Sequence, residues 1–152
     1  IGAIQTRVYK GLGEFGRLRE MSRAYGMVVS DAVRVQNRIK SIYRSRGIPT
    51  GRKEVYAPAA RVAWLQKLPT HVHSLAAILY EELDAVRALQ KRAAKELLTE
   101  ARQHRIFHVL RTCPGLGMIR TSQLLPIVVT PYRFASKRGF WAYAGMAIVM
   151  RS

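Results

Sequence analysis

Apolar side chains recur between residues 18 and 42 at alternating steps of three and four positions. Such steps place them on one side of an α-helix, and their persistence over several heptads is typical of a coiled-coil seam. We expect the helix to end at Gly47, Ile48 and Pro49, because glycine permits a left-handed cap and proline cannot continue a helix. The pattern therefore predicts one long helix with a seam formed by Leu18, Met21, Tyr25, Val28, Ala32, Val35, Ile39 and Ile42.

A second seam of the same kind begins after Pro69 and Thr70 and predicts a helix that runs to about His108. Between the two seams, residues 52–68 predict a shorter helix that Pro58 breaks near its start. Long amphipathic helices joined in this way either fold back as an antiparallel pair or pair with a second subunit, and the sequence leaves both arrangements open. The second seam consists of Val72, Leu75, Leu79, Leu83, Val86, Leu89, Ala93 and Leu97.

From residue 106 onward the sequence predicts a helix, a tight turn and a second helix. Pro114 is expected to end the first helix and Gly115 to adopt a positive φ. Leu116 is expected to turn into the core, and Gly117 allows a ligand to approach the backbone closely. The unpaired amides from Gly117 to Arg120 can then hold a phosphate oxygen, aided by the helix dipole. This arrangement resembles the helix-hairpin-helix motif that binds the DNA backbone, although an ordinary corner between two helices needs glycine for the same steric reason.

A third stretch, residues 132–146, interleaves aromatic side chains with Arg133, Lys137 and Arg138. Aromatic rings can stack on bases while the cations pair with phosphates. Three of its residues, Phe140, Tyr143 and Ala144, share one helical face, so for them we expect a place in the core.

The composition narrows the classes of partner. The chain has 152 residues, of which 26 are Lys or Arg and 9 are Asp or Glu, and its formal net charge is +17. Apolar residues make up 49% of the chain, which is enough to bury a core and excludes a disordered basic tail. Positive charge in such excess repels itself unless a polyanion neutralises it, so nucleic acid is the first candidate partner.

Two parts of the sequence carry cations without any acidic residue among them: the segment after Glu100 and the segment from residue 34 to residue 53. A single charge run is usually a solvated face, but two acid-free blocks favour contact with nucleic acid. The predicted nucleic-acid-binding residues are Arg34, Arg38, Lys40, Arg44, Arg46, Pro114, Gly115, Leu116, Gly117, Arg120, Arg133, Lys137 and Arg138.

Other classes of function find little support in the sequence. No apolar run approaches the roughly 20 residues that span a bilayer, so we expect no membrane partner. Cys113 is the only cysteine, which excludes an internal disulfide and fits a cytoplasmic location. His104 and His108 share a helix face but lack a third ligand, and the acidic residues between 81 and 84 spread around a helix, so we predict no metal site.

Taken in order, these pieces resemble a known family. The turn from Cys113 to Gly117, then Arg133 and Phe134, then the run from residue 140 to residue 146 look like the C-terminal domain of certain insertion-sequence transposases. Members of that family pair an RNase H-like domain bearing four carboxylates with a serine domain, and they are the bridge-RNA-guided recombinases. The residues around Leu18, Arg34, Arg38 and Arg46 similarly resemble the family's linker helix.

The resemblance implies DNA transposition by strand exchange, in which a serine hydroxyl attacks a phosphodiester and stays bonded to the DNA until rejoining. Ser152 is the candidate nucleophile. The resemblance further implies Mg²⁺ for the full-length protein and none in this part, a structured RNA beside DNA as partners, and homo-oligomerisation. In this interpretation residues 1–11 trail from an absent catalytic domain, residues 12–105 form a coiled-coil linker, and residues 106–152 form a truncated helix-hairpin-helix domain.

Two function classes therefore stand side by side. The first is the DNA-binding part of a transposase, which we expect to be inactive by itself. The second is a non-enzymatic basic helix-hairpin-helix module that grips DNA or structured RNA. For both we predict an all-α fold in which long, antiparallel, coiled-coil-like helices precede a small helix-hairpin-helix domain.

Overall fold

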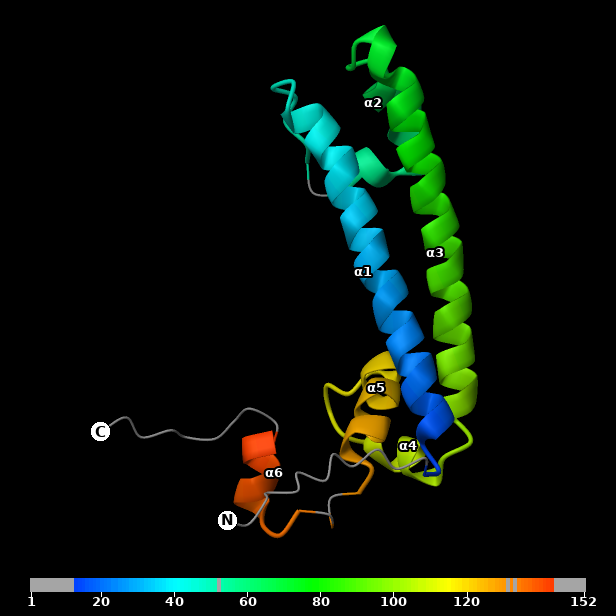
Figure 1. Ribbon diagram of the computed structural model, residues 1–152, viewed down its shortest axis with the longest axis vertical. Coiled ribbons are helices and arrows are strands. Elements are labelled where there is room, and N and C mark those ends of the chain that lie inside the picture. The colour runs from blue at the N-terminus through cyan, green and yellow to red at the C-terminus, as the bar shows by residue number, and fades with distance from the viewer. Residues whose placement is uncertain (1–12, 52, 131, 133, 144–152) are drawn as a thin grey trace, which may run out of the picture.

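A computed structural model describes residues 13–51, 53–130, 132 and 134–143, and these contain helices and no strand (Figure 1). The prediction of an all-α fold is confirmed. The longest elements are α1 (Gly16–Arg44) and α3 (His73–Ala101), which lie side by side and run in opposite directions. The two seams thus close on each other within one chain, which is the antiparallel alternative left open by the sequence.

The connection between α1 and α3 departs from the predicted helix over residues 52–68. In the described residues it consists of η1 (Glu54–Tyr56), η2 (Pro58–Ala60), the five-residue α2 (Arg61–Leu65) and η3 (Thr70–Val72). The predicted break is confirmed, because Pro58 disfavours the helical region at the residue before it and Ala57 is extended at φ −73° and ψ 125°. The predicted length was wrong, because only Arg61–Leu65 form an α-helix. The result is a compact cap of short turns.

This cap closes the distal cluster, a core between the C-terminal half of α1 and the N-terminal half of α3. Its centre is aromatic. The hydroxyls of Tyr43 and Tyr80 lie 3.0 Å apart in the buried interior, and the ring of Trp64 packs edge-on against Tyr43 with 5.3 Å between centroids. The buried members are Val35, Ile39, Tyr43, Val55, Tyr56, Trp64, Leu68, Val72, Ala76, Tyr80 and Leu83.

At the other end, α3 stops at Ala101 rather than near His108, so the predicted end was wrong. His104 is extended, at φ −95° and ψ 121°, and its carbonyl accepts the first hydrogen bond of α4 (Arg105–Leu110), from the amide of Phe107. The His104 ring is buried against Phe15, with 4.7 Å between centroids. The chain therefore turns under the helix pair and continues into α5 (Met118–Val128).

The helices α4 and α5 share a second core, the basal cluster, with the ends of α1 and α3. An ion pair of 3.1 Å between Arg17 and the nearly buried Glu100 joins α1 to α3 at its edge. A guanidinium nitrogen of Arg19 donates to the carbonyl of Pro126 over 3.2 Å, which ties α1 to α5. The buried apolar members of this cluster are Phe15, Leu18, Leu97, Ala101, Phe107 and Leu125.

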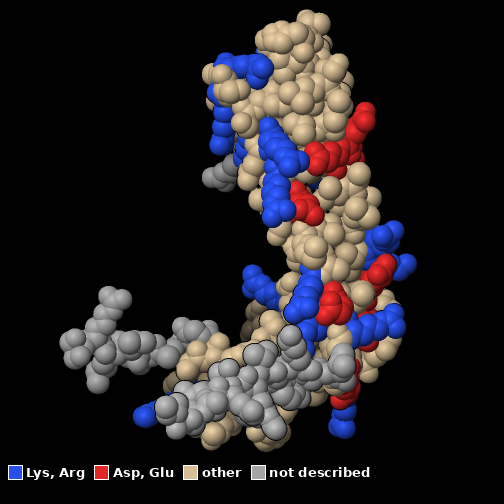
Figure 2. Space-filling view, viewed as in Figure 1, with Lys and Arg blue, Asp and Glu red and all other residues tan. Residues whose placement is uncertain are grey.

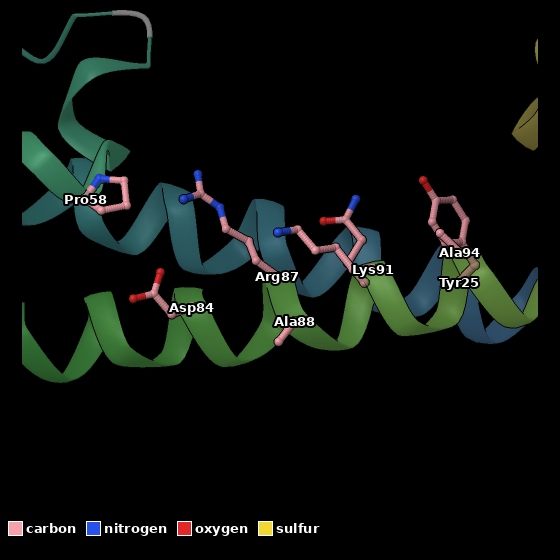
Figure 3. A pocket seen from close by; sticks show the side chains of 8 residues that line it. Tyr25, Pro58, Asp84, Arg87, Ala88, Lys91 and Ala94 are labelled. Atoms are coloured by element: carbon pink, nitrogen blue, oxygen red, sulfur yellow. The ribbon is translucent and has the colours of Figure 1, made fainter.

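Between the two clusters the helix pair has a waist, which we define as residues 19–31 of α1 and 84–96 of α3. No side chain of either segment is buried. Gly26 contributes no side chain, and Ala93 and Ala94 on the facing helix are small. A hollow of about 560 Å³ opens at this level, and Figure 3 shows Tyr25, Arg87 and Lys91 among its lining side chains.

The last described element, α6 (Lys137–Tyr143), has no buried residue. Tyr143 is 53% exposed and Phe140 is half-buried, so the prediction that they join the core was wrong. Both rings instead contact Phe134, with centroids 5.3 Å and 5.1 Å from it, which gives them a local aromatic partner outside both clusters. Ala144, assigned to the same face, lies outside the described residues.

Candidate nucleic-acid interface

The turn between α4 and α5 has the backbone that its glycines predict. Gly115 adopts φ +82°, where residues with a Cβ are strained, so the predicted positive φ is confirmed. Gly117 is extended at φ −73° and ψ 164° and forms the N-cap of α5. Leu116 was expected to turn into the core, but it is half-buried and belongs to neither cluster.

The start of α5 presents amide groups that precede its first internal hydrogen bond. That bond runs from the amide of Thr121 to the carbonyl of Gly117 over 3.0 Å. The buried hydroxyl of Thr121 donates to the same carbonyl over 3.1 Å, which holds the cap in place. In an α-helix the amides before this point have no helical acceptor, and the helix dipole adds positive potential there.

A shallow depression of about 420 Å³ lies in front of these amides. It is lined by Gly115, Gly117, Met118, Ile119 and Arg120, and the Arg120 side chain is exposed. A Cβ added to Gly117 would meet no protein atom within 4 Å. The protein interior therefore does not require glycine at this position, and the open space is available to a ligand.

In the basic block of residues 34–53, some cations pair with carboxylates and others do not. Arg34 pairs with Asp31 over 2.9 Å, and Arg38 pairs with Glu82 of α3 over 3.0 Å. The block is acid-free along the sequence but not in space, because α3 brings a carboxylate alongside it. Exposed pairs of this kind contribute about 0–1 kcal/mol, so a phosphate can replace the carboxylate at little cost.

The other members of the block are held by neutral groups. The Nε of Arg44 donates to the hydroxyl of Thr50 over 3.1 Å, and Arg46 donates to the carbonyl of Ile42 over 2.8 Å. Lys40 lies over the ring of Tyr56, with Nζ 5.5 Å from the centroid. None of these three cations has a carboxylate partner among the described residues. In Figure 2, red side chains lie among the blue ones along the helix pair, whereas the blue group where α1 ends has none beside it.

Most of the acidic side chains form ion pairs, half of them between two elements and half within one helix. Six of the nine carboxylates pair with arginine. The shortest pair joins Arg61 and Asp84 through two hydrogen bonds of 2.5 Å and 2.6 Å. This hydrogen bonding holds the pKa of Asp84 below its usual range. The pairing leaves every lysine of the described residues without a carboxylate partner.

The sequence prediction missed two cations on α3. Arg87 donates to the carbonyl of Tyr56 over 3.2 Å, and Lys91 projects into the hollow at the waist (Figure 3). Both lie close after acidic residues along the chain, so they belong to neither acid-free block. Their spacing of four, which places them on one face of a helix, is the signal that would have found them.

The remaining predicted residues are placed only in part. Lys137 and Arg138 are exposed on α6, and Nζ of Lys137 lies 4.8 Å from the centroid of Trp141. Arg133 and the candidate nucleophile Ser152 lie outside the described residues. Among the residues that the structure describes, no three His, Cys, Asp or Glu side chains gather as a metal site requires. In the same part of the chain, no helix is long and apolar enough to cross a bilayer.

Comparison of the chain with protein-family models, with curated proteins and with solved structures finds no match.

Proposed function

We propose that this chain grips the sugar-phosphate backbone of DNA, as the DNA-holding part of a transposase of the serine-nucleophile insertion-sequence type. One observation carries the proposal. The turn at Gly115 and Gly117 exposes the amides that begin α5 in an open depression beside Arg120, in a chain with a net charge of +17.

The grip depends on groups that already point toward the ligand. A phosphate oxygen accepts hydrogen bonds from the amides at the start of α5, and its negative charge is favoured there by the helix dipole. The exposed guanidinium of Arg120 supplies a charge-assisted bond at the edge of the same depression. Backbone amides recognise phosphate alone, so this contact positions the protein on DNA without reading bases.

The transposase part of the proposal depends on the family resemblance of the sequence. In such a reaction the oxygen of the serine hydroxyl bonds to phosphorus and displaces a deoxyribose oxygen, which takes up the proton. A deoxyribose hydroxyl of the exchanged strand later attacks the same phosphorus, and the serine hydroxyl is released. The covalent ester preserves the bond energy, so no external energy source is needed. In this scheme the described helices bring DNA toward Ser152.

The competing proposal is a non-enzymatic module that uses the same turn to hold DNA or structured RNA. The depression at Gly117 supports both proposals equally, because it contacts only phosphate. The flanking gene sequence separates them. Carboxylate-bearing sequence before residue 1, with serine and glycine followed by basic residues beyond residue 152, favours the transposase.

The test is a salt titration of DNA binding by fluorescence anisotropy, using a labelled duplex about two helical turns long. Affinity should fall by about a thousandfold or more between about 50 and 200 mM salt, because phosphate contacts release condensed cations. A flat response would remove nucleic acid as the partner.

The variant Gly117→Ala locates the contact. Alanine adopts φ −73° without strain, and its methyl group touches no protein atom but stands in the depression. We expect affinity to fall about tenfold while the thermal midpoint changes by only a few degrees. The matched control is Gly26→Ala in the middle of α1, where the added methyl also meets nothing. Equal affinities of the two variants would place the contact away from the turn.

A further inference from the structure

A second concave site lies on the helix pair, away from the turn between α4 and α5. It is a hollow of about 350 Å³ where α1, the cap and α3 meet, and we call it the Tyr56 pocket. Three of its lining side chains are cations, two are amides and one is a phenol, and none is a carboxylate. The lining consists of Gln36, Asn37, Lys40, Lys53, Tyr56 and Arg87.

Tyr56 builds this pocket. Its side chain is only 6% exposed, and its hydroxyl donates to the backbone carbonyl of Gln36 over 3.1 Å, which fixes the ring against α1. Lys40 of α1 lies over that ring, and Arg87 of α3 donates to the Tyr56 carbonyl. One buried residue therefore holds cations from two helices at the same place. Groups held in this way lose little conformational entropy when an anion binds.

Within the described residues no carboxylate forms an ion pair with a cation of the pocket, although the charge of Arg87 contributes to lowering the pKa of Asp84. Lys40 and Lys53 have no carboxylate partner there, and the partner of Arg87 is a neutral carbonyl. The acids Glu82 and Asp84 on the neighbouring turns of α3 pair with Arg38 and Arg61.

The nearby positive charges also act on the hydroxyl of Tyr56, which lines the pocket. Burial raises the pKa of the Tyr56 hydroxyl, and the charges of Arg44 and Arg87 oppose that rise. An anion in the pocket would relieve the mutual repulsion of these cations, which is the physical reason for expecting one.

We propose that the Tyr56 pocket binds a phosphodiester of the nucleic-acid backbone, as a second contact separate from the turn at Gly117. Lys40, Lys53 and Arg87 neutralise the phosphate, and the side-chain amides of Gln36 and Asn37 donate to its oxygens or to a sugar hydroxyl. The inference rests on the proposed function and extends it to the helix pair. DNA and RNA present the same phosphodiester, so the experiment includes a duplex of each.

The test compares the double variant Lys40→Gln, Lys53→Gln with the control Lys95→Gln in the full 152-residue chain. Lys95 is exposed on α3 and outside the pocket. We expect the double variant to bind about tenfold more weakly and to lower the salt slope by about one, whereas the control stays near the parent. Loss with the DNA duplex, the RNA duplex or both identifies the source of the phosphate. Circular dichroism confirms that each variant is folded.

A second measurement detects the contact directly. Lysine acetylation followed by mass spectrometry should show Lys40 and Lys53 protected by the bound duplex and Lys95 unprotected. If the double variant binds like the control and both pocket lysines stay reactive, the inference fails while the Gly117 result still stands. If the parent chain binds neither duplex, the proposed function and the inference fail together.

Discussion

The helix pair is closed at its two ends by different chemistry. The distal cluster is rich in aromatic rings and contains a buried pair of hydroxyls, under a cap of short turns. The basal cluster has a similar share of rings, with Phe15 and Phe107 among its six buried members, but none of these members carries a hydroxyl, and the element that closes the cluster is the turn proposed to bind DNA. Damage to the basal end should therefore affect both stability and binding, whereas damage to the distal core should affect stability first.

The largest expected effect comes from Phe107→Ala. Phe107 is 1% exposed and is the main contact of α4 with the basal cluster, so its loss should lower the free energy of unfolding by about 3–5 kcal/mol. Urea titration followed by circular dichroism measures this change. DNA affinity measured below the unfolding transition should also fall.

The control is Leu83→Ala, at an equally buried distal position. It should lower the free energy of unfolding by about 2–5 kcal/mol and preserve the contact at Gly117. Equal losses of affinity in the two variants would contradict the division between the ends.

The buried hydroxyl pair of the distal cluster allows a sharper test. Tyr43→Phe leaves the Tyr80 hydroxyl buried without its partner, which should cost about 1–3 kcal/mol. The double variant Tyr43→Phe, Tyr80→Phe removes both polar groups and should be nearly as stable as the parent. Chemical denaturation of the three proteins measures the difference. A double variant less stable than the single one would show that the hydroxyl pair stabilises the core beyond mutual satisfaction.

The same pair predicts how stability depends on alkaline pH. Burial raises the pKa of Tyr43 and of Tyr80 above that of a free tyrosine. The unfolded chain therefore releases these protons first, and the free energy of unfolding should fall as the pH rises above about 10, toward the raised values. Below that pH the contribution is constant. The double phenylalanine variant should lose less stability over the same interval, and an identical decline in both proteins would assign it to other groups.

The smallest effect tests the waist. Gly26→Ala adds a methyl group that meets no other atom and replaces a poor helix former, so it should raise the free energy of unfolding by about 0.5–1 kcal/mol. Thermal unfolding detects this as a shift of a few degrees. Destabilisation instead would show that the two helices approach more closely at this level than the structure has them.

The long helices could be predicted because their heptad pattern is local. The end of α3 could not, because apolar residues such as Ile106 and Phe107 continue the pattern after the chain has turned at His104. In the cap the break at Pro58 was predictable from residue type, whereas the short length of α2 was not.

The candidate site was predictable where it depends on backbone and not where it depends on tertiary contacts. The turn was predictable because glycine at positions 115 and 117 is itself a turn signal. Which cations of the helix pair find partners depends on residues far away in sequence, such as Glu82 for Arg38 and Tyr56 for Arg87. No inspection of consecutive residues reveals such partners.

The waist also has a mechanical consequence. From its centre to the end of α1 the helix extends for about 30 Å at a rise of 1.5 Å per residue. Because no side chain is fully buried at this level, packing between the two helices opposes bending less here than at the two clusters. A deflection of about 10° would then carry the distal end through an arc of about 5 Å, which is the height of one helical turn.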